Sequence, residues 1–524
     1  MSVKKTILMT TLVAVLGFFC YGLGFACTSF IAGKNATADG SVITAHNEDL
    51  TGDTAQRVEV FPRRTFKANE FQYLISGAAL PWVAEIYKLI QFNSGSDPSD
   101  YNQDNPNCLN EWGVSTWDNA QTPRTELRAI EDLNVQAVDS KELKRIPIER
   151  AKTAREAVEI LGWLVDTYGF IQNGMTYGIA DPEEGWIVEV TKGKHWVAQR
   201  VPDDMVVMRA NCYRIQNVNL ADSANFMGSA DLVSFAQAQG WYNPATDGDF
   251  NFSRAYGSPS SMSAASNTLR EWGALNYLKP SLNLPWDPNG TFPFVTNDRG
   301  IGNGVVPDQK ITVKGTRGFL RQHYEGTPQD ATNGYANGSP HWTQNRVICV
   351  NTTNSSSIIQ LRSWLPPEIG HVLWRTEKSP CTGVYVPWYL GITTTPVEFR
   401  TGTEAPSSDS AWWTYTSLVM LLDPHYGTFI PKVRPVFDAF EDSLFASQPA
   451  IEQQALDIYE KITQGNKNVG KKNQTKTTKL EDYLNRYSGD TALSALDIAR
   501  GLVNQLLHDS AKGSWKNNAF CPVD

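Results

Sequence analysis

Cys27 is the residue with the clearest chemical potential in this chain, because of what precedes it. Two lysines near the start are followed by a mostly apolar stretch at residues 7–19, and Gly24-Phe25-Ala26 places small residues where a signal peptidase reads. An apolar stretch of about 13 residues is short for a membrane span, which needs about 20. We therefore expect residues 1–26 to be an export signal that is removed, so that the mature chain begins at Cys27.

A cysteine at a free N-terminus carries a nucleophile and a base in one residue. Its thiol can attack a carbonyl carbon, and its α-amine, with an unperturbed pKa of about 7.7–8.0, can accept the thiol proton and return it to a leaving amine. No separate catalytic histidine is needed, and the seven histidines form no recognisable cysteine-protease signature. Cys27 has two other interpretations, as a lipid-attachment point and as an ordinary buried or disulfide-bonded cysteine. Lipoprotein signals favour leucine where this chain has Gly24.

The composition is that of a well-packed globular protein of 524 residues. Apolar residues make up 41% of the chain and charged residues 19%, which excludes a largely disordered protein. The formal net charge of −9 argues against binding to nucleic acid or anionic lipid. We expect no nucleic-acid partner and no integral membrane span after signal removal, and we expect the mature protein to be exported to the periplasm or the extracellular medium.

The cysteines show no spacing typical of a metal site. Besides Cys20 in the signal and Cys27, the chain has Cys108, Cys212, Cys349, Cys381 and Cys521, with no Cys-x-x-Cys pair. An odd number cannot all pair, and an exported protein permits a disulfide without requiring one. Cys349 and Cys381 are one candidate disulfide pair. We expect neither a metal nor a cofactor.

The segment after Cys27 predicts a β-hairpin. Two β-prone runs, 28–33 and 41–46, flank a polar turn that ends in Asp39-Gly40. Cys27 would then lie on a strand. Two further extended segments are expected at 187–198, as a second hairpin, and at 205–210.

Helical patterns occur in two regions. A helix is predicted after Thr153, where Glu156 completes a capping pattern, and it should end at Gly169. The Pro-, Gly- and Asn-rich stretch 243–340 is expected to form long ordered loops. Helices are expected again from about residue 433, at 451–462, 480–487 and 491–508.

A series of short motifs occurs in a fixed order between residues 27 and 400. They include Cys27-Thr28-Ser29, Asp39-Gly40-Ser41, Asn47-Glu48-Asp49, Asn110-Glu111-x-Gly113-Val114, Glu149-Arg150-Ala151, Ala180-Asp181, Val201-Pro202-Asp203-Asp204, Arg270-Glu271-Trp272, Tyr324-Glu325-Gly326-Thr327 and Gln360-Leu361-Arg362. As an ordered set they resemble the dipeptidases among the N-terminal-nucleophile (Ntn) cysteine hydrolases, relatives of bile salt hydrolases and penicillin V acylases.

The resemblance implies a fold of the α+β class, an αββα sandwich in which two stacked antiparallel sheets lie between helical layers. Residues 27–432 would form this domain, with the nucleophile at the end of an inner strand, and residues 433–524 would form a helical C-terminal extension. The implied activity is hydrolysis of a dipeptide or another small amide, with Cys27 as nucleophile. The sequence is compatible with a homo-oligomer.

The resemblance also assigns roles to five other residues. Asp49 resembles the acid that orients the α-amine. Asn211 resembles the asparagine whose side-chain amide contributes to the oxyanion hole, and Asn110 the residue whose backbone N–H completes it. Arg270 resembles an arginine near the nucleophile, and we expect it to bind substrate, as we do for His46, which stands where relatives commonly have arginine. With an unperturbed pKa near 6.5, His46 would be largely neutral at pH 7.

Two other functions remain open at this stage. An acylase for bile-salt-type or penicillin-type amides would use the same core with a more apolar pocket. A lipid-anchored binding protein of the cell envelope would carry an acyl group on Cys27 and use the aromatic-rich middle of the chain as a ligand surface. Acylation would occupy the α-amine and remove the proposed base.

Overall fold

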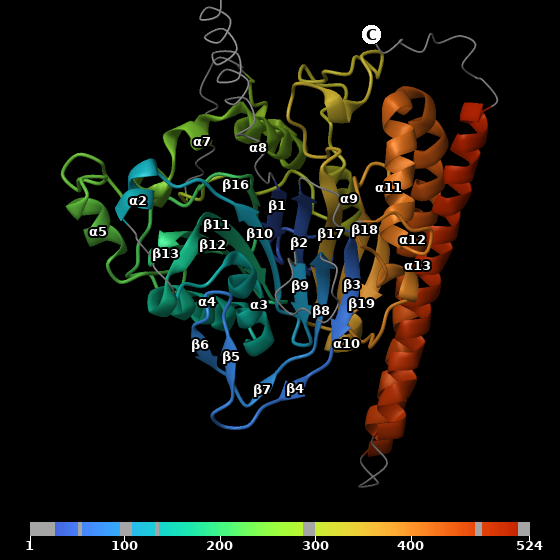
Figure 1. Cartoon of the computed structure of the whole chain (residues 1–524), viewed down its shortest axis with the longest axis horizontal. Helices are drawn as coiled ribbons and strands as arrows, with labels where there is room; N and C mark the ends of the chain where they lie inside the picture. The colour runs from blue at the N-terminus through green and yellow to red at the C-terminus, as the bar shows by residue number, and fades with distance from the viewer. Residues whose placement is uncertain are drawn as a thin grey trace, which may run out of the picture.

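The computed structural model describes residues 27–50, 55–94, 107–130, 136–286, 299–403, 405–466 and 474–511. The expected signal at 1–26, with Cys20, and Cys521 at the other end lie outside the described residues. Two antiparallel sheets are stacked face to face, with helices on both outer sides (Figure 1). Within the ranges given, no helix is both long and apolar enough to cross a lipid bilayer.

The first sheet holds the strand that follows Cys27. Its order is β16 (Gly304–Val305), β14 (Val206–Arg209), β1 (Thr28–Ala32), β2 (Val42–Asp49), β17 (Thr353–Leu361), β18 (His371–Glu377) and β19 (Val386–Tyr389). Strands β1 and β2 pair with Thr28 opposite Asn47, which confirms the predicted N-terminal hairpin. Because β14 pairs with the other edge of β1, Cys27 precedes an interior strand whose residues are all buried.

The second sheet is a meander in which most strands neighbour the next one along the chain. Its order is β15 (Phe226–Gly228), β13 (Trp196–Val201), β12 (Gly185–Gly193), β11 (Phe170–Ala180), β10 (Ser115–Ala120), β9 (Asn107–Asn110), β8 (Leu89–Ser94) and β3 (Gln56–Phe61). The pairing of β12 with β13 confirms the hairpin predicted at 187–198, and β14 confirms the extended segment at 205–210. Two small ribbons, β4 (Arg64–Thr65) with β7 (Glu85–Ile86) and β5 (Phe71–Tyr73) with β6 (Ala79–Pro81), complete the strands described.

Helices α3 (Ser140–Arg150) and α4 (Ala154–Tyr168) cover the second sheet. Helix α4 begins where the sequence predicts, because the Thr153 side chain accepts a hydrogen bond from the Glu156 N–H. It ends at Gly169, which adopts a φ of 80° that favours glycine. The capping residues alone therefore located both ends of this helix.

On the opposite side, α8 (Ala265–Leu278), α9 (Val313–Leu320) and α11 (Ala411–Leu422) pack against the first sheet. Residues 243–340 were expected to contribute long ordered loops, and the structure shows that they also supply helices α8 and α9. The high content of Gly, Pro and Asn over this stretch hid two short runs with buried apolar faces, such as Leu269, Trp272 and Leu275 of α8. The first sheet needs these two helices to cover its outer face.

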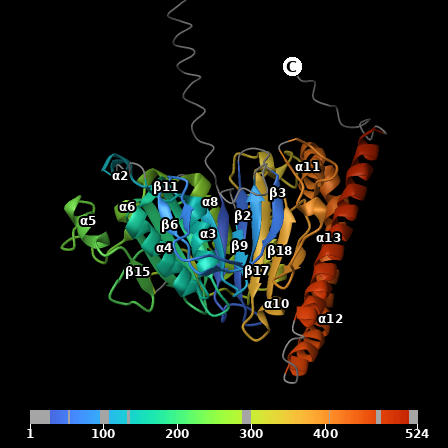
Figure 2. The ribbon, with the colours of Figure 1, turned by 60° about the horizontal axis from the view of Figure 1, so that its bottom comes forward.

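The C-terminal region forms a long hairpin of two helices, α12 (Tyr426–Asn466) and α13 (Gln474–Ala511), beside the first sheet (Figure 2). The sequence predicted helical structure from residue 433, and α12 begins seven residues earlier (433 − 426 = 7), at Tyr426. The segments predicted at 480–487 and 491–508 are one continuous helix. Helix α13 packs against β19 and α11, so the hairpin is part of the helical layer.

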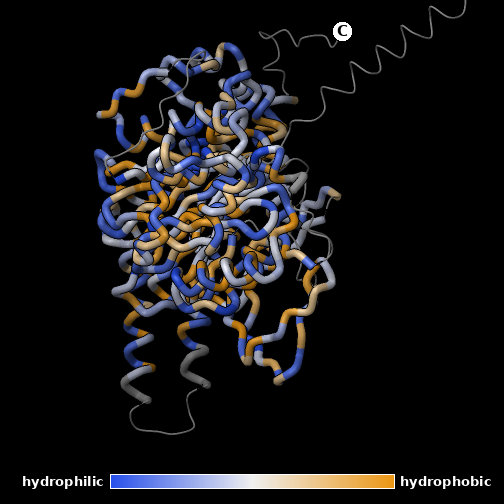
Figure 3. The backbone as a smooth tube through the Cα atoms, turned by 90° about the vertical axis from the view of Figure 1, so that its left-hand side faces the viewer, coloured by the Kyte–Doolittle hydropathy of each residue, from blue (hydrophilic) through white to orange (hydrophobic). Residues whose placement is uncertain are grey.

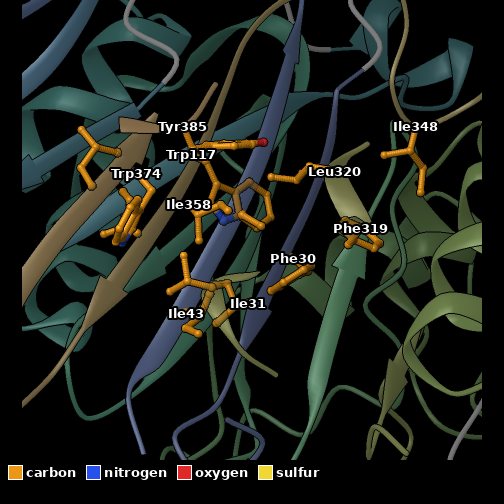
Figure 4. Close-up of a cluster of buried hydrophobic side chains, with 14 of the residues drawn as sticks. Phe30, Ile31, Ile43, Trp117, Phe319, Leu320, Ile348, Ile358, Trp374 and Tyr385 are labelled. Atoms are coloured by element: carbon orange, nitrogen blue, oxygen red, sulfur yellow. The ribbon is translucent and has the colours of Figure 1, made fainter. Parts of the chain in front are cut away.

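The apolar core fills the space between the sheets and continues under the helices. Phe30 of β1 points toward α9 and meets Phe319 with ring centroids 5.0 Å apart, while Ile31 packs toward Trp117 and the second sheet (Figure 4). Apolar residues gather inside the body of the molecule and alternate with polar ones along the protruding helices (Figure 3). Because β1 is buried on both faces, the position of Cys27 is fixed by the packing on either side.

Candidate active site

Cys27 lies at the wall of a pocket of about 420 Å³ between the two sheets. Cys27 is only 3% exposed, so the pocket is the route by which a small molecule would reach its sulfur. Around Cys27 the wall is built by the end of β2, strand β10, the first turns of α3 and the start of β11. The lining residues are Glu48, Leu50, Asp118, Ala120, Gln121, Ser140, Lys141, Lys144, Gln172, Asn173, Gly174 and Met175.

Glu48 is the side chain that the Cys27 thiol contacts. The Cys27 Sγ lies 3.6 Å from Glu48 Oε2 and donates a hydrogen bond to it. Sequence reasoning placed Glu48 in a motif without giving it a role. The alternation of side chains along a strand could have indicated Glu48, because His46 and Glu48 are two residues apart and must share the face of β2 that meets the second sheet.

The surroundings of Cys27 favour the neutral thiol. Burial raises the pKa of the Cys27 thiol well above its usual value, and the charges of Glu48, Asp49 and Asp118 raise it further. The backbone N–H of Asp49 acts in the opposite direction but is outweighed. At neutral pH the nucleophile therefore needs a base that removes its proton during attack.

Replacing Glu48 with glutamine is expected to lower the Cys27 thiol pKa, because a negative charge that disfavours the thiolate is removed. The rate of Cys27 alkylation by iodoacetamide, measured across pH, should then rise at a lower pH than in the unaltered mature protein. Glu183→Gln, which changes an exposed carboxylate paired with Lys34, should leave the profile in place. An unchanged profile in Glu48→Gln would show that Glu48 does not control the thiol.

The backbone carbonyl of Cys27 is held from two sides. Arg270 Nη1 donates a hydrogen bond to this oxygen at 2.5 Å and lies 3.2 Å from Thr28 Oγ1. Asn119 Nδ2 of β10 approaches the same carbonyl at 3.4 Å, and the Ser29 hydroxyl donates to Asn119 Oδ1 at 2.6 Å. Asn119 was not predicted from the sequence, because it lies in none of the motifs. Together these contacts fix the backbone that carries the nucleophile.

Arg270 is fully buried in α8, where a role in direct substrate binding was expected. Burial lowers its pKa to about 10, so the guanidinium stays charged at neutral pH. Its Nη2 donates to Asn211 Oδ1 at 2.9 Å and to Asn267 Oδ1 at 2.8 Å. The guanidinium thus joins Cys27 to Asn211 in this structure, and the expected substrate binding stays a prediction.

Asn211 follows β14 and is half-buried. Its Nδ2 donates to the Ala120 carbonyl at 2.9 Å, and its Oδ1 accepts from Arg270. A primary amide has two N–H groups, so this contact leaves a second one for an oxyanion. The structure thus brings Asn211 to Cys27 through Arg270.

Asp49 points to the opposite face of β2 from Glu48. Thr353 Oγ1 donates to Asp49 Oδ1 at 2.6 Å, and Arg346 forms an ion pair with Oδ2. Burial raises the pKa of Asp49, and Arg346 and Thr353 counteract this shift. Its charge acts on both the Cys27 thiol and the Arg270 guanidinium, which places Asp49 in the same electrostatic cluster.

His46 of β2 is buried, and its ring is neutral. Burial lowers its pKa to about 3, which agrees with the predicted neutrality at pH 7. Its Nε2 lies 3.0 Å from the Asp118 carbonyl and its Nδ1 3.2 Å from Asn107 Nδ2, so we assign the proton to Nε2. His46 is not among the lining residues of the pocket, but one of its ring nitrogens, the Cys27 sulfur and a Glu48 carboxylate oxygen lie within 4.8 Å of one another, so the expected substrate binding stays a prediction.

Asn110 is not brought to Cys27. It lies in the β9–β10 turn, at the opposite end of β10 from Asn119. Its backbone N–H, expected to complete the oxyanion hole, donates to the Val114 carbonyl at 2.9 Å. Its side chain donates to the carbonyls of Ile148 and Ala151 and so ties the turn to the end of α3. This role is structural.

Cys27 is a buried thiol at the start of an interior strand of an αββα sandwich. Its backbone is fixed, and a pocket opens at its sulfur. These features and the family comparison define the class of the protein as a cysteine peptidase. The chain belongs to peptidase family C69, whose family model matches residues 26–438.

The chain is 31% identical over 384 residues to a probable dipeptidase of Salmonella dublin, covering 71% of this chain and 83% of that protein. It is 27% identical over 445 residues to a probable dipeptidase of Latilactobacillus sakei, covering 82% and 89%. Among solved structures, a mutant of the conjugated bile acid hydrolase from Clostridium perfringens is similar at 10% identity and a TM-score of 0.28, covering 67% of this chain and 89% of that one.

Proposed function

We propose that the mature protein is an exported cysteine dipeptidase whose first residue, Cys27, is the nucleophile. The observation that carries this proposal is the pocket at the Cys27 sulfur, which offers both signs of charge. Glu48 is suited to the ammonium group of a free dipeptide and Lys141 to its carboxylate, while Asp118 and Lys144 of the same wall form an ion pair with each other at 2.9 Å. The names of the relatives from Salmonella dublin and Latilactobacillus sakei support the same substrate class.

The size and polarity of the pocket favour a dipeptide over a larger apolar amide. A volume of about 420 Å³ is at the small end of ligand pockets, and Leu50, Ala120 and Met175 are the apolar side chains of its wall. Bile-salt-type amides would need a broad apolar surface for the acyl part. This contrast weighs against the acylase alternative.

The burial of Cys27 weighs against a lipid-anchored envelope protein. A lipoprotein carries its acyl groups on the cysteine sulfur and amine, and these must reach the bilayer. In this chain Cys27 is only 3% exposed, and its sulfur is hydrogen-bonded to Glu48 between two sheets. A lipid on this sulfur would have to displace the β1 end from its packing.

The proposed mechanism uses Cys27 alone for covalent chemistry. As the sulfur attacks the peptide carbonyl carbon, the α-amine of Cys27 takes the thiol proton. The free N–H of the Asn211 side chain stabilises the oxyanion, and Asp49 holds the amine in place. The tetrahedral intermediate breaks its C–N bond, and the amine returns the proton to the departing amino acid. Water then attacks the thioester and releases the second amino acid and the thiol.

The decisive experiment measures release of free amino acids from a mixed dipeptide panel by the mature protein and by Cys27→Ala, both with residue 27 as the true N-terminus. We expect release by the first and a loss of at least about 10³-fold in the second, because the covalent route is removed. Cys108→Ala, which changes a buried cysteine outside the pocket, is the matched control and should retain activity.

Each other outcome has a definite meaning. Equal release by the mature protein and Cys27→Ala would remove Cys27 from catalysis. Hydrolysis of bile-salt-type or penicillin-type amides without dipeptide cleavage would favour the acylase. An intact mass with added acyl groups on Cys27 would favour the envelope protein.

A further inference from the structure

Four buried side chains that the proposed mechanism does not use converge at one point beside the first sheet. They are His323, just after α9; His341, in the short 3-10 helix Pro340–Trp342; Cys349, before β17; and Cys381, after β18. One ligand atom from each, a sulfur or an imidazole nitrogen, lies within 4.8 Å of all the others. All four residues are buried.

The distances in this cluster match the corners of a tetrahedral zinc site. With Zn–S bonds of about 2.3 Å and Zn–N bonds of about 2.0–2.1 Å, ligand atoms on neighbouring corners lie roughly 3.3 to 3.8 Å apart. His341 Nε2 lies 3.2 Å from Cys381 Sγ and 3.8 Å from Cys349 Sγ. Two thiolates with two imidazoles are one of the ligand sets that hold structural zinc.

Both histidines are oriented as metal ligands usually are. His341 Nδ1 lies 2.8 Å from Asp423 Oδ1, and His323 Nδ1 lies 2.8 Å from Glu325 Oε1. Each carboxylate therefore holds the proton on Nδ1 and leaves Nε2 directed into the cluster. A metal-bound histidine commonly donates its other N–H to such a carboxylate, which fixes the tautomer and the ring.

The environment of His323 Nε2 is a separate observation that favours a metal at this point. This nitrogen is buried and makes no hydrogen bond of regular geometry among the residues that the structure describes, and the polar group that it faces is Cys381 of the same cluster. A buried polar atom without a regular hydrogen bond is costly, and a metal would satisfy it.

The same geometry corrects the candidate disulfide between Cys349 and Cys381. Both are free thiols in the structure. Two imidazole nitrogens aimed at the sulfurs, with carboxylates behind the imidazoles, would not stabilise a disulfide. The same arrangement would stabilise a bound cation.

We propose that His323, His341, Cys349 and Cys381 bind a structural Zn²⁺ ion. The ion would tie together the stretch from the end of α9 to the start of β17, where the short 3-10 helix is the one described helical or strand element. Arg346, which pairs with Asp49, lies in this stretch between His341 and Cys349. The zinc would thus brace the loop that reaches the active site from the outer side of the first sheet.

The test is the metal content of the mature protein after gel filtration in metal-free buffer, measured by mass spectrometry of the elements. We expect about one zinc per chain in the unaltered protein, and Zn K-edge absorption that fits two sulfur and two nitrogen neighbours. Cobalt-substituted protein should show the visible bands of tetrahedral thiolate coordination. These measurements need no variant and so do not depend on whether a variant folds.

Variants then locate the metal. Cys381→Ser and His341→Ala are expected to reduce bound zinc by at least tenfold, while Cys108→Ser and Cys27→Ala retain it, since neither lies in the cluster. The proposal is overturned by a Cys349–Cys381 disulfide in the exported protein, by failure to bind added Zn²⁺, or by full zinc content in both cluster variants. Dipeptide hydrolysis by a zinc-free protein would leave the function of Cys27 standing, so the two proposals fail separately.

Discussion

A mature protein that carries one additional residue before Cys27 is expected to lose dipeptide hydrolysis by about 10²–10⁴-fold, the range that a positioned general base contributes. The thiol is unchanged in such a protein, but its base becomes an amide nitrogen that cannot accept a proton. The effect is expected to be large because burial and the neighbouring carboxylates keep the Cys27 thiol protonated. No other group in the proposed mechanism removes that proton.

The measurement compares kcat/KM before and after removal of a cleavable N-terminal extension that leaves Cys27 as the first residue. The same preparation serves as its own control, because cleavage restores the base without changing any side chain. Intact mass establishes the N-terminus in both states. Equal activity before and after cleavage would contradict the role of the α-amine and would call for a side-chain base, for which Glu48 is the nearest candidate at 3.6 Å from the sulfur.

Glu441→Gln is expected to destabilise the protein by about 3–5 kcal/mol, the usual cost of removing one partner from a buried ion pair. Glu441 of α12 is fully buried, and its carboxylate lies 2.6 Å from both Arg317 Nη1 and Arg321 Nη2 and 3.3 Å from Arg434 Nη2. It also accepts the Tyr385 N–H at 2.6 Å. Glutamine would leave these arginines without their shared charge and would loosen the C-terminal helical hairpin from α9 and β19.

The change is measured as the free energy of unfolding in urea, beside Asp442→Asn as the matched control. Asp442 is the next residue of α12. It pairs with Lys314 at 2.9 Å and lies farther from Arg317, at 3.4 Å, but its own side chain is 45% exposed, so its loss should cost no more than about 1 kcal/mol. Similar losses for the two variants would show that the Glu441 cluster does not anchor the hairpin.

The pH dependence of the same cluster follows from the direction of its pKa shift. Burial by itself raises the pKa of Glu441, but Arg321, Arg434 and Arg317 outweigh it and hold the pKa below its usual value. A depressed folded-state pKa stabilises the protein above the unfolded-state value and loses that contribution as the pH falls through the folded-state value. The difference in stability between the unaltered protein and Glu441→Gln should therefore shrink as the solution is acidified.

The sequence by itself determined the features that depend on neighbouring residues. The hairpin after Cys27 follows from two β-prone runs around Asp39-Gly40, and the limits of α4 follow from Thr153 and Gly169. Such signals act through backbone conformation and capping, which need no distant partner. The ordered motifs further indicated the αββα class, and the chemistry that we propose for Cys27 rests on its position after a predicted signal.

Only the tertiary structure decided which distant residues meet Cys27. Arg270 reaches the Cys27 carbonyl across 243 residues of sequence, and Asn119 reaches it from the other sheet. Asn110 was predicted at the site from its motif, yet the direction of β10 carries it to the far end of the strand. The stacking of the two sheets and the register of their strands determine which of these residues come into contact. Neither can be derived from the spacing of residues in the sequence.

The four proposed zinc ligands likewise could not be predicted from the sequence. His323, His341, Cys349 and Cys381 have no spacing that a metal motif would recognise, and sequence reasoning expected no metal. They converge because a helix end, a loop and the ends of two strands of one sheet meet beside that sheet. Residue types determined what chemistry this chain can perform, and long-range packing decided where that chemistry assembles, because only packing brings distant side chains within bonding distance.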